Sequence, residues 1–498
     1  MSGSAGLSLR TRIARSIFWL AWSRGVLQVC SFATTLLIAH YLMPADYGVM
    51  ALASFWTGSV GMLAEMGLGA AIIQFRDLDK REINACFWMT MILAILAFAA
   101  LAVGAPMIAR WFAEPRLADV LPVLALVLPV ISCRVVSDSL LRKRLALDRV
   151  SQAEVIGVVV TLPVMLVCAF KGLGIWTLVV GGLLAPAAQS AATIFFAPWC
   201  PGIRVGGVRV KEVVQFSLAA VGVRLLWVLR ESSNTLVIGK VAGSGILGLY
   251  SMASDLALLP GSKISAVVNM LSSPMMAALQ TDIDAMRAAF YRAVRLTAAI
   301  AVPTSAGMAL VANEGVAVLL GPKWSPLVPL LQLLCLYAAV RAVDVLLPPV
   351  LFARRRQNFL FWYCLVLLIV VPAAAVLGGW WDEADRAAGV IIFSTPVYCA
   401  VMAIMAKEAL TEIKGSFSQL WREIWPILTA TAAMAAAVML LRAFSIPAPT
   451  EAPLVGLIVL SASGAATYFI VLWAIGSPVI GEGIEVIGWI LRRRSGDG

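Results

Sequence analysis

Apolar runs of about 20 residues recur from end to end of the chain, separated by short segments rich in charged residues and glycine. A helical run of this length matches the hydrocarbon thickness of a bilayer. The pattern therefore predicts an all-α polytopic membrane protein with about fourteen transmembrane helices. The predicted bounds are 17–42, 48–73, 84–105, 117–138, 153–171, 174–197, 213–238, 245–272, 293–313, 326–350, 359–378, 387–406, 424–442 and 452–476.

Composition narrows the class of protein further. Hydrophobic residues make up 61% of the 498 residues and charged residues only 13%, which excludes an ordinary soluble chain. The predicted spans use nearly the whole length, so no large soluble domain fits between them. The formal net charge of +11 does not indicate a nucleic-acid partner, because Lys and Arg fall in short clusters between apolar runs.

The basic clusters predict the orientation. Most of the 38 Lys and Arg residues fall on one side when the N-terminus is placed in the cytoplasm. Both termini are then cytoplasmic, and the first run is too long for a signal-peptide core, which predicts a retained helix. Arg354, Arg355 and Arg356 are typical of topology signals that contact anionic lipid. We therefore expect a multi-pass membrane protein with both termini in the cytoplasm.

An internal repeat with an offset of 200 residues supports a two-lobed bundle. Two six-helix lobes, arranged as parallel repeats, are predicted for residues 1–200 and 201–410. Residues 411–498 are expected to add two transmembrane helices and a basic cytoplasmic tail. The identical pairs are Arg24 and Arg224, Thr35 and Thr235, Leu36 and Leu236, Ile38 and Ile238, Gly48 and Gly248, Ala53 and Ala253, and Ser54 and Ser254.

Cationic and amide side chains inside apolar spans are the candidate binding residues. A charge at the centre of a membrane helix costs about 2.5–3.5 kcal/mol, so such residues usually face a bundle interior or a watery cavity. Arginine can replace the lost hydration of a phosphate with bidentate hydrogen bonds. The alternative is that each cation pairs with a nearby carboxylate and only holds the bundle together. The candidates are Arg24, Arg224, Arg230, Arg341, Lys263 and Asn234.

Three acidic residues lie inside predicted spans, namely Glu65, Asp255 and Asp344. Burial favours the protonated form of a carboxyl group, so each is a candidate for proton or sodium coupling. The alternative is again a balancing role beside an arginine. The eight cysteines show no metal or redox spacing, and we expect no disulfide, metal or cofactor.

Short motifs resemble those of bacterial polysaccharide exporters. Residues 42–48, LMPADYG, are similar to an L-x-P-x-x-Y-G turn, and residues 67–74, GLGAAIIQ, resemble a G-L-x-x-A-x-I-Q segment. Residues 140–145, LLRKRL, resemble L-L-x-R-x-L, and residues 321–324, GPKW, resemble a G-x-x-W loop. Residues 238–250 are similar to I-G-[RK]-x-x-G-x-x-x-L-G-x-Y. The chain thus resembles Wzx-type flippases of the multidrug/oligosaccharidyl-lipid/polysaccharide superfamily.

The resemblance implies a function without covalent chemistry. It implies a flippase that moves polyprenyl-diphosphate-linked oligosaccharide units from the cytoplasmic to the outer leaflet by alternating access. The expected partners are that substrate, membrane lipids, and the polymerase and chain-length machinery of surface polysaccharide. Asn234 stands where many relatives carry Asp, which puts proton coupling through that position in doubt.

Two other functions stay open from the sequence. A cation or drug antiporter of the same superfamily would favour an acidic, aromatic cavity over an arginine-rich one. A polytopic glycosyltransferase, polymerase or ligase would need a sizeable outer loop with paired carboxylates. A nucleotide-driven pump is disfavoured, because the sequence has no phosphate-binding loop motif.

Overall fold

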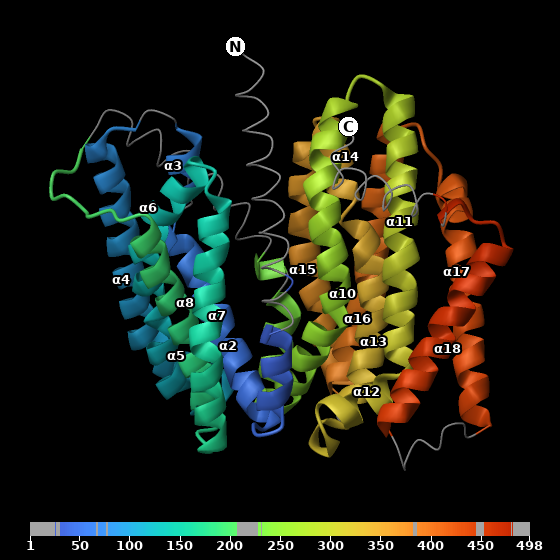
Figure 1. Ribbon diagram of the computed structural model, residues 1–498, viewed down its shortest axis with the longest axis horizontal. Coiled ribbons are helices and arrows are strands. Elements are labelled where there is room, and N and C mark those ends of the chain that lie inside the picture. Colours follow the sequence, from blue (N-terminus) through green and yellow to red (C-terminus); the bar gives the residue numbers. More distant parts are fainter. Residues whose placement is uncertain are drawn as a thin grey trace. The chain divides into compact units, whose positions relative to one another are not determined.

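The structure is a computed structural model, and its described part is entirely helical with connecting turns (Figure 1). Side chains are not described at residues 70, 71, 263–271, 273, 274 and 453. The described residues are 25, 30–65, 68–75, 78–206, 228–230, 232–381, 386–444, 453–479 and 481.

Eleven helical stretches of the described residues are long and apolar enough to cross a membrane, and they match eleven predicted spans. Span 1 is helical at Cys30–Ala39, span 7 lies largely outside the described residues, and span 8 falls within a 36-residue helix, Gly243–Ala278. The total of fourteen therefore stays a prediction. The helices are α2 (Pro44–Glu65), α3 (Leu68–Gln74), α4 (Lys80–Phe112), α5 (Leu117–Ala125), α6 (Val127–Lys143), α7 (Leu147–Phe170), α8 (Ile175–Phe196), α10 (Gly243–Ala278), α11 (Ile283–Leu310), α12 (Ala312–Leu319), η1 (Pro322–Trp324), α13 (Leu327–Asp344), α14 (Leu347–Ala353), α15 (Gln357–Trp381), α16 (Arg386–Glu412), α17 (Phe417–Ala443) and α18 (Pro453–Ala474).

Polar caps determine where several helices begin. Asp79 and Glu82 form a reciprocal capping box at the start of α4. The carboxylate of Asp282 accepts from the N–H of Ala285 at the start of α11, and the hydroxyl of Ser416 accepts from the N–H of Gln419 at the start of α17. These caps start α4, α11 and α17 4 to 10 residues before the predicted spans, because the apolar pattern alone does not report the polar first turns.

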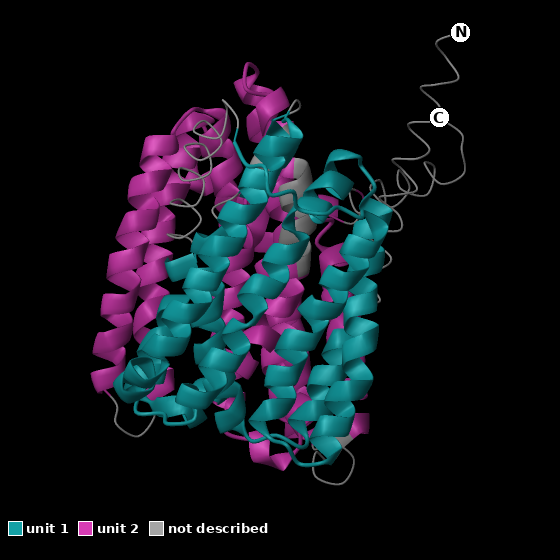
Figure 2. Ribbon diagram, turned by 90° about the vertical axis from the view of Figure 1, so that its left-hand side faces the viewer, with its two compact units in different colours: residues 1–248 teal, residues 249–498 magenta. Residues whose placement is uncertain are grey.

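The chain divides into two compact units, residues 1–248 and residues 249–498 (Figure 2). Unit 1 contains α2 to α8, the helical residues 228–230 and 232–241, and the first turn of α10. Unit 2 contains the rest of α10 and α11 to α18. The predicted lobes at 1–200 and 201–410 remain a prediction about the repeat.

Corresponding helices pack on one another in the two units. In unit 1, α7 packs on α8, α4 packs on α5 and α6, and α6 also contacts α8. In unit 2, α15 packs on α16, α11 packs on α13, and α13 also contacts α16. Helices α17 and α18 pack on each other and on α11, so they are an addition that unit 1 does not have among its described residues.

Three landmarks recur in unit 2 at an offset of 210 residues. The spans Leu117–Lys143 and Leu327–Ala353 are both 27 residues long. Each is followed by one residue in the left-handed conformation, Leu145 with φ 56° and Arg355 with φ 59°. The next helix begins at Leu147 in unit 1 and at Gln357 in unit 2. The recurrence supports the internal repeat that the sequence predicted, with an offset that has grown from 200 to 210 along the chain.

Glycine allows the closest helix pairs to approach. A Cβ atom on Gly157 of α7 would lie 2.8 Å from the carbonyl oxygen of Ala185 on α8. One on Gly378 of α15 would lie 2.2 Å from the carbonyl oxygen of Gly389 on α16. Small residues at such crossings are the usual means of tight helix packing in membranes. Lipid is as apolar as the side chains, so close van der Waals packing and not the hydrophobic effect holds the helices together.

Candidate functional site

Two helix starts related by the internal repeat cross in unit 1 at backbone contact. A Cβ atom on Gly48 of α2 would lie 1.8 Å from the carbonyl oxygen of Ser244. One on Gly248 of α10 would lie 1.7 Å from the carbonyl oxygen of Pro44. Both positions therefore exclude any side chain beyond hydrogen. We call the two segments 44–48 and 244–248 the repeat junction.

Ionic contacts surround the repeat junction. Arg116 donates to Glu114 at 2.8 Å and to Asp46 at 3.1 Å. The hydroxyl of Ser244 donates to the other oxygen of Glu114. Glu114 and Arg116 belong to the turn between α4 and α5, so this turn ties the start of α2 to the start of α10.

A second contact ties the helix before α10 to the end of α4. The ammonium group of Lys240 donates to the carbonyl oxygen of Trp111 and lies 4.8 Å from the centroid of its indole ring. A cation over the face of an aromatic ring is attracted by the quadrupole of the ring. Both cations thus have partners on another segment of the chain, Arg116 in Asp46 and Lys240 in Trp111.

The carboxyl group of Glu114 is held in its ionised form. Burial acts to raise its pKa, but the hydrogen bonds from Arg116 and Ser244 outweigh burial and hold the pKa below the ordinary value of 4.5. A group with a depressed folded-state pKa stabilises the fold above its unfolded pKa. That stability is lost as the pH falls through the folded-state value.

We predict that Glu114→Gln removes part of the acid sensitivity of the protein. The wild-type chain should lose thermal stability between about pH 5 and pH 3 as Glu114 takes up a proton. The variant should show a flatter pH dependence in that range, measured as the unfolding midpoint of the purified protein. Asp284→Asn, which changes an exposed carboxylate, serves as the control and should keep the wild-type slope. An unchanged slope in Glu114→Gln would contradict the assignment.

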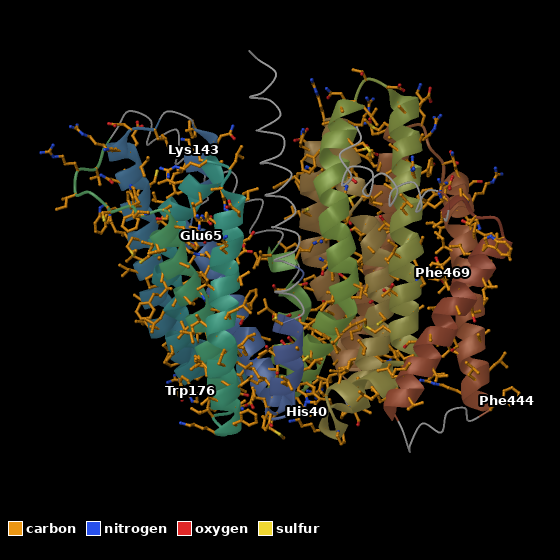
Figure 3. The ribbon with its side chains drawn as sticks, viewed as in Figure 1. His40, Glu65, Lys143, Trp176, Phe444 and Phe469 are labelled. Atoms are coloured by element: carbon orange, nitrogen blue, oxygen red, sulfur yellow. The ribbon has the colours of Figure 1, made fainter. Side chains whose placement is uncertain are left out.

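A cavity of about 270 Å³ lies in unit 1 between α2 and α6, with polar side chains among a mostly apolar lining. Its polar lining residues are Ser54, Thr57, Glu65 and Ser132. Figure 3 shows Glu65 between the end of unit 1 that carries Lys143 and the end that carries Trp176 and His40. Glu65 ends α2, a helix long and apolar enough to cross a membrane, and its role as an intramembrane acid stays a prediction.

Arg134 of α6 is a charged neighbour of this cavity. It lies within electrostatic range of Glu65, of Asp138 on its own helix and of Glu154 on α7. Asp138 is also bridged to Arg142 at 2.7 Å. Arg134 thus stands among carboxylates, which favours a balancing role over phosphate binding.

The predicted binding residues of the helix before α10 are partly described. Arg230 is 8% exposed, and its carbonyl oxygen accepts from the hydroxyl of Ser233. The side-chain oxygen of Asn234, one turn further on, is shielded from solvent and accepts no hydrogen bond from the described residues. Arg24 and Arg224, the two predicted arginines related by the repeat, lie outside the described residues.

Unit 2 gathers two other predicted residues into a tyrosine-rich cluster. Asp344, the last residue of α13, is 4% exposed and accepts from the hydroxyl of Tyr398 at 2.7 Å and from that of Tyr363 at 3.5 Å. Arg341, one turn earlier, donates to the hydroxyl of Tyr337 at 3.1 Å. The rings of Tyr337 and Tyr398 meet edge to face at 5.1 Å.

The remaining predicted residues do not join a described cluster. Asp255 is an exposed residue of α10. Lys263 lies on the same helix, and its side chain is outside the description. The structure thus places Arg341 one turn before Asp344 on α13, describes Arg230 and Asn234 in the helical residues 228–230 and 232–241, and places Glu65 in the lining of the unit 1 cavity.

An apolar groove of about 960 Å³ lies in unit 2 between α11, α17 and α18. Figure 3 shows Phe469 of α18 partway along the bundle and Phe444 beyond the end of α17. The groove is almost free of polar side chains. Its lining includes Leu296, Ile300, Pro303, Met308, Val311, Met434, Val438, Leu460, Ala465, Tyr468, Phe469, Leu472, Trp473 and Val479.

Two ion pairs bound this groove at its two ends. Arg295 of α11 binds Glu423 of α17, and Glu314 of α12 accepts from Arg442 of α17 at 2.7 Å. The partners of each pair are 128 residues apart, so the two pairs keep one register between parallel helices. The 19 residues from Glu423 to Arg442 span roughly 28 Å of helix, which is close to the hydrocarbon thickness of about 30 Å.

Sequence reasoning missed both the groove and its ion pairs. It ended one predicted span at residue 313, just before Glu314, and another at Arg442, without relating the two residues. The only sequence signal is that charged residues stand near the ends of adjacent apolar runs. That signal does not reveal which run lies beside which in space.

Sequence comparisons agree with the motifs. Residues 37–329 match the family described as "Polysaccharide biosynthesis protein". The chain is 23% identical over 339 residues to the lipopolysaccharide biosynthesis protein WzxC of Escherichia coli, covering 68% of this chain and 69% of the relative. It is 22% identical over 324 residues to the succinoglycan biosynthesis transport protein ExoT of Rhizobium meliloti, covering 65% of this chain and 66% of the relative.

Solved structures give the fold. The chain is similar to the lipid II flippase MurJ in an inward closed conformation, with a TM-score of 0.72 at 12% identity over 93% of this chain and 99% of that one. It is also similar to an inward-facing multidrug-resistance transporter of the MATE family, with a TM-score of 0.61 at 14% identity over 80% of this chain and 99% of that one. Since the matched residues 37–329 cover more than half of a polytopic chain with this fold, the chain belongs to the polysaccharide biosynthesis protein family.

Proposed function

We propose that this protein is a flippase that moves polyprenyl-diphosphate-linked oligosaccharide repeat units from the cytoplasmic to the outer leaflet of the bacterial inner membrane. It works by alternating access and supplies surface polysaccharide export. The proposal rests on the family, on relatives named for polysaccharide biosynthesis and transport, and on a fold similar to that of a lipid II flippase. No covalent step is part of it, so the protein is not an enzyme.

The apolar groove of unit 2 carries this proposal. A polyprenyl-linked substrate has a long hydrocarbon tail that must stay in an apolar environment while its headgroup crosses the membrane. The groove is open, almost wholly apolar, and bounded by ion pairs roughly 28 Å apart along α17. A transporter of small hydrophilic cations has no use for such a long apolar surface.

The charged headgroup needs polar groups along its path. Moving a diphosphate through hydrocarbon costs a prohibitive desolvation free energy unless protein groups replace its lost hydration. Arg24, Arg224, Arg230, Arg341 and Lys263 are the proposed cationic contacts, and Asn234 is a proposed sugar or phosphate contact. Glu65, Asp255 and Asp344 are the proposed sites of ion coupling.

The orientation follows from the basic clusters and completes the proposal. Both termini lie in the cytoplasm, so the repeat junction is on the outer side and the turn at Arg354 to Arg356 is on the cytoplasmic side. Arg354 and Arg356 are ion-paired with Glu412 of α16 in the structure. The polysaccharide polymerase and the chain-length machinery are the proposed downstream partners.

Filling the apolar groove should slow transport of the natural substrate. Ala465 lines the groove and is exposed, so a tryptophan fits there without displacing the fold. We expect Ala465→Trp to reduce transport of a long-chain polyprenyl substrate by about tenfold, which corresponds to a binding loss of about 1.4 kcal/mol. A substrate analogue with a short prenyl chain should be affected far less. The measurement is flipping of the two substrates by purified protein in vesicles.

Ala466→Trp is the matched control for this prediction. Ala466 is the next residue of α18, is also exposed, and does not line the groove. It should transport both substrates like the wild-type chain. Equal loss in both tryptophan variants, or equal loss with both substrates, would contradict a tail-binding groove.

The function itself is tested by where complete repeat units accumulate in cells. Deletion of the chain should leave complete polyprenyl-linked units in the inner leaflet and abolish surface polysaccharide. If complete units instead reached the outer leaflet unpolymerised, a polymerase or ligase would replace the flippase as the conclusion. If surface polysaccharide stayed normal while resistance to cationic drugs fell, the drug antiporter would replace it.

A further inference from the structure

Unit 2 carries a buried carboxylate, Asp344, whose hydrogen-bond donors belong to an apolar core cluster. This cluster contains Tyr363 and Tyr398 together with Phe290 and Val294 of α11 and Leu346 beside the end of α13. A carboxylate in such surroundings is costly to ionise unless hydrogen-bond donors or a cation hold it. Tyr398 and Tyr363 supply two hydroxyl donors from two different helices, α16 and α15.

Asp344 also stands at a break in its transmembrane span. Helix α13 ends at Asp344, and α14 begins at Leu347 after two intervening residues. The position equivalent to Asp344 in unit 1, 210 residues earlier, is Arg134, which lies inside the unbroken helix α6. The two repeats thus carry opposite charges at the same place, and only unit 2 joins its charge to a helix break.

The groups that face Asp344 suit a proton better than a metal ion. Both of its oxygens accept from tyrosine hydroxyls, and the described residues contain no group of three or more His, Cys, Asp or Glu side chains that could hold a metal. The same core cluster also contains Tyr291 of α11, Cys364 of α15 and Tyr337 of α13, and Arg341 lies one turn before Asp344 on α13. The helices packed on α13 further carry Arg292 and Arg295 on α11, and Cys399, Lys407, Glu408 and Glu412 on α16. On α10 the side chain of Lys263 is not described.

We propose that Asp344 is the residue that takes up and releases the proton driving transport, with Tyr363 and Tyr398 as the donors that hold its ionised form. This proposal rests on the proposed function. Asp344 is chosen over Glu65 and Asp255 as the coupling acid, and the proton is chosen over sodium as the coupling ion. Asp344 accepts a proton from water on the outer side and returns it to water on the cytoplasmic side as substrate moves outward. Charge-assisted hydrogen bonds tie the end of α13 to α15 and α16 while Asp344 is ionised, and protonation weakens these bonds so that the break can rearrange.

The test uses the purified full-length chain in lipid vesicles that contain a polyprenyl-diphosphate oligosaccharide and an internal pH-sensitive dye. With a pH difference of one unit, exchange of one proton for one substrate gives a leaflet ratio of about ten at steady state. The wild-type chain should reach a substantial part of this ratio and move protons in the opposite direction. Asp344→Asn should bring the substrate to equal leaflet amounts without proton movement.

Two further variants keep the result decisive. Asp284→Asn changes an exposed carboxylate that bridges only its own helix neighbour Arg287, and it should behave like the wild-type chain. Tyr398→Phe keeps the ring but removes the donor to Asp344, so half-maximal proton flux should move to higher pH. If Asp344→Asn does not fold, the Tyr398→Phe profile decides, and an unchanged profile overturns the proposal.

The outcomes separate this inference from the proposed function. A wild-type chain that equalises the substrate between leaflets regardless of the pH difference overturns the inference and leaves the flippase standing. So does an Asp344→Asn variant that still builds a gradient-driven excess. A wild-type chain that moves no substrate under any condition overturns both.

Discussion

Gly248→Ala is expected to abolish most transport, because the repeat junction has no room for a methyl group. The added Cβ atom would lie 1.7 Å from the carbonyl oxygen of Pro44, which is backbone and cannot rotate away. Overpacking of this kind typically costs about 1–3 kcal/mol and here must separate α2 from α10. We expect a fall in substrate flipping of more than about tenfold, a threshold that corresponds to 1.4 kcal/mol. Flipping and the unfolding midpoint of the purified variant are the measurements.

Gly245→Ala is the matched control for the junction. Gly245 lies on α10, three residues before Gly248, and a Cβ atom there meets nothing within 4 Å. Alanine is the better helix former by about 0.5–1 kcal/mol, so this variant should be as stable as the wild-type chain or slightly more so. If Gly248→Ala matched Gly245→Ala in flipping and stability, the crossing of the two repeats would not be required for function.

The second large effect is expected at the ion pair between α12 and α17, whose carboxylate is buried and whose arginine is 29% exposed. Glu314 is only 5% exposed and receives both of its short contacts from Arg442. Removing one partner of a buried pair leaves an uncompensated charge and costs about 3–5 kcal/mol. We therefore expect Arg442→Leu to lower the unfolding midpoint strongly and to loosen α17 from unit 2, which limited proteolysis of the purified protein would report.

A double variant separates lost pairing from lost packing. Glu314→Gln combined with Arg442→Leu removes the orphaned charge, so it should recover most of the stability that Arg442→Leu loses. Asp284→Ala is the comparison. The Asp284 side chain is 83% exposed and pairs with Arg287 on the same helix, and such surface pairs contribute about 0–1 kcal/mol. If Arg442→Leu cost no more than Asp284→Ala, the pair of Glu314 and Arg442 would not fix α17 to α12 at this end of the groove.

The helices were predictable because their cause is local. A run of about 20 apolar residues has to satisfy its backbone hydrogen bonds internally in lipid, whatever lies beside it. The predicted spans 174–197 and 452–476 agree with α8 and α18 to within two residues at each end. The error at 84–105 is larger, since α4 extends from Lys80 to Phe112 through polar turns that the apolar pattern does not reach.

The sites were less predictable because their contacts join distant parts of the chain. Asp344 was identified from its position inside an apolar run, but its donor Tyr398 is 54 residues away on another helix. Glu114 and Ser244 are 130 residues apart, and neither is unusual in its local sequence. The repeat gave the equivalence of Gly48 and Gly248, but only the structure shows that they touch.

Flipping by the purified protein tests the central claim most directly. Vesicles would carry a fluorescent polyprenyl-diphosphate oligosaccharide in both leaflets, and a membrane-impermeant reductant would bleach only the outer one. About half of the fluorescence should be lost in empty vesicles, since only that half is accessible at the start. Vesicles with the wild-type chain should lose nearly all of it, and those with Gly248→Ala should resemble the empty ones. Loss limited to half in the presence of correctly inserted wild-type protein would contradict the account that this chain is a flippase.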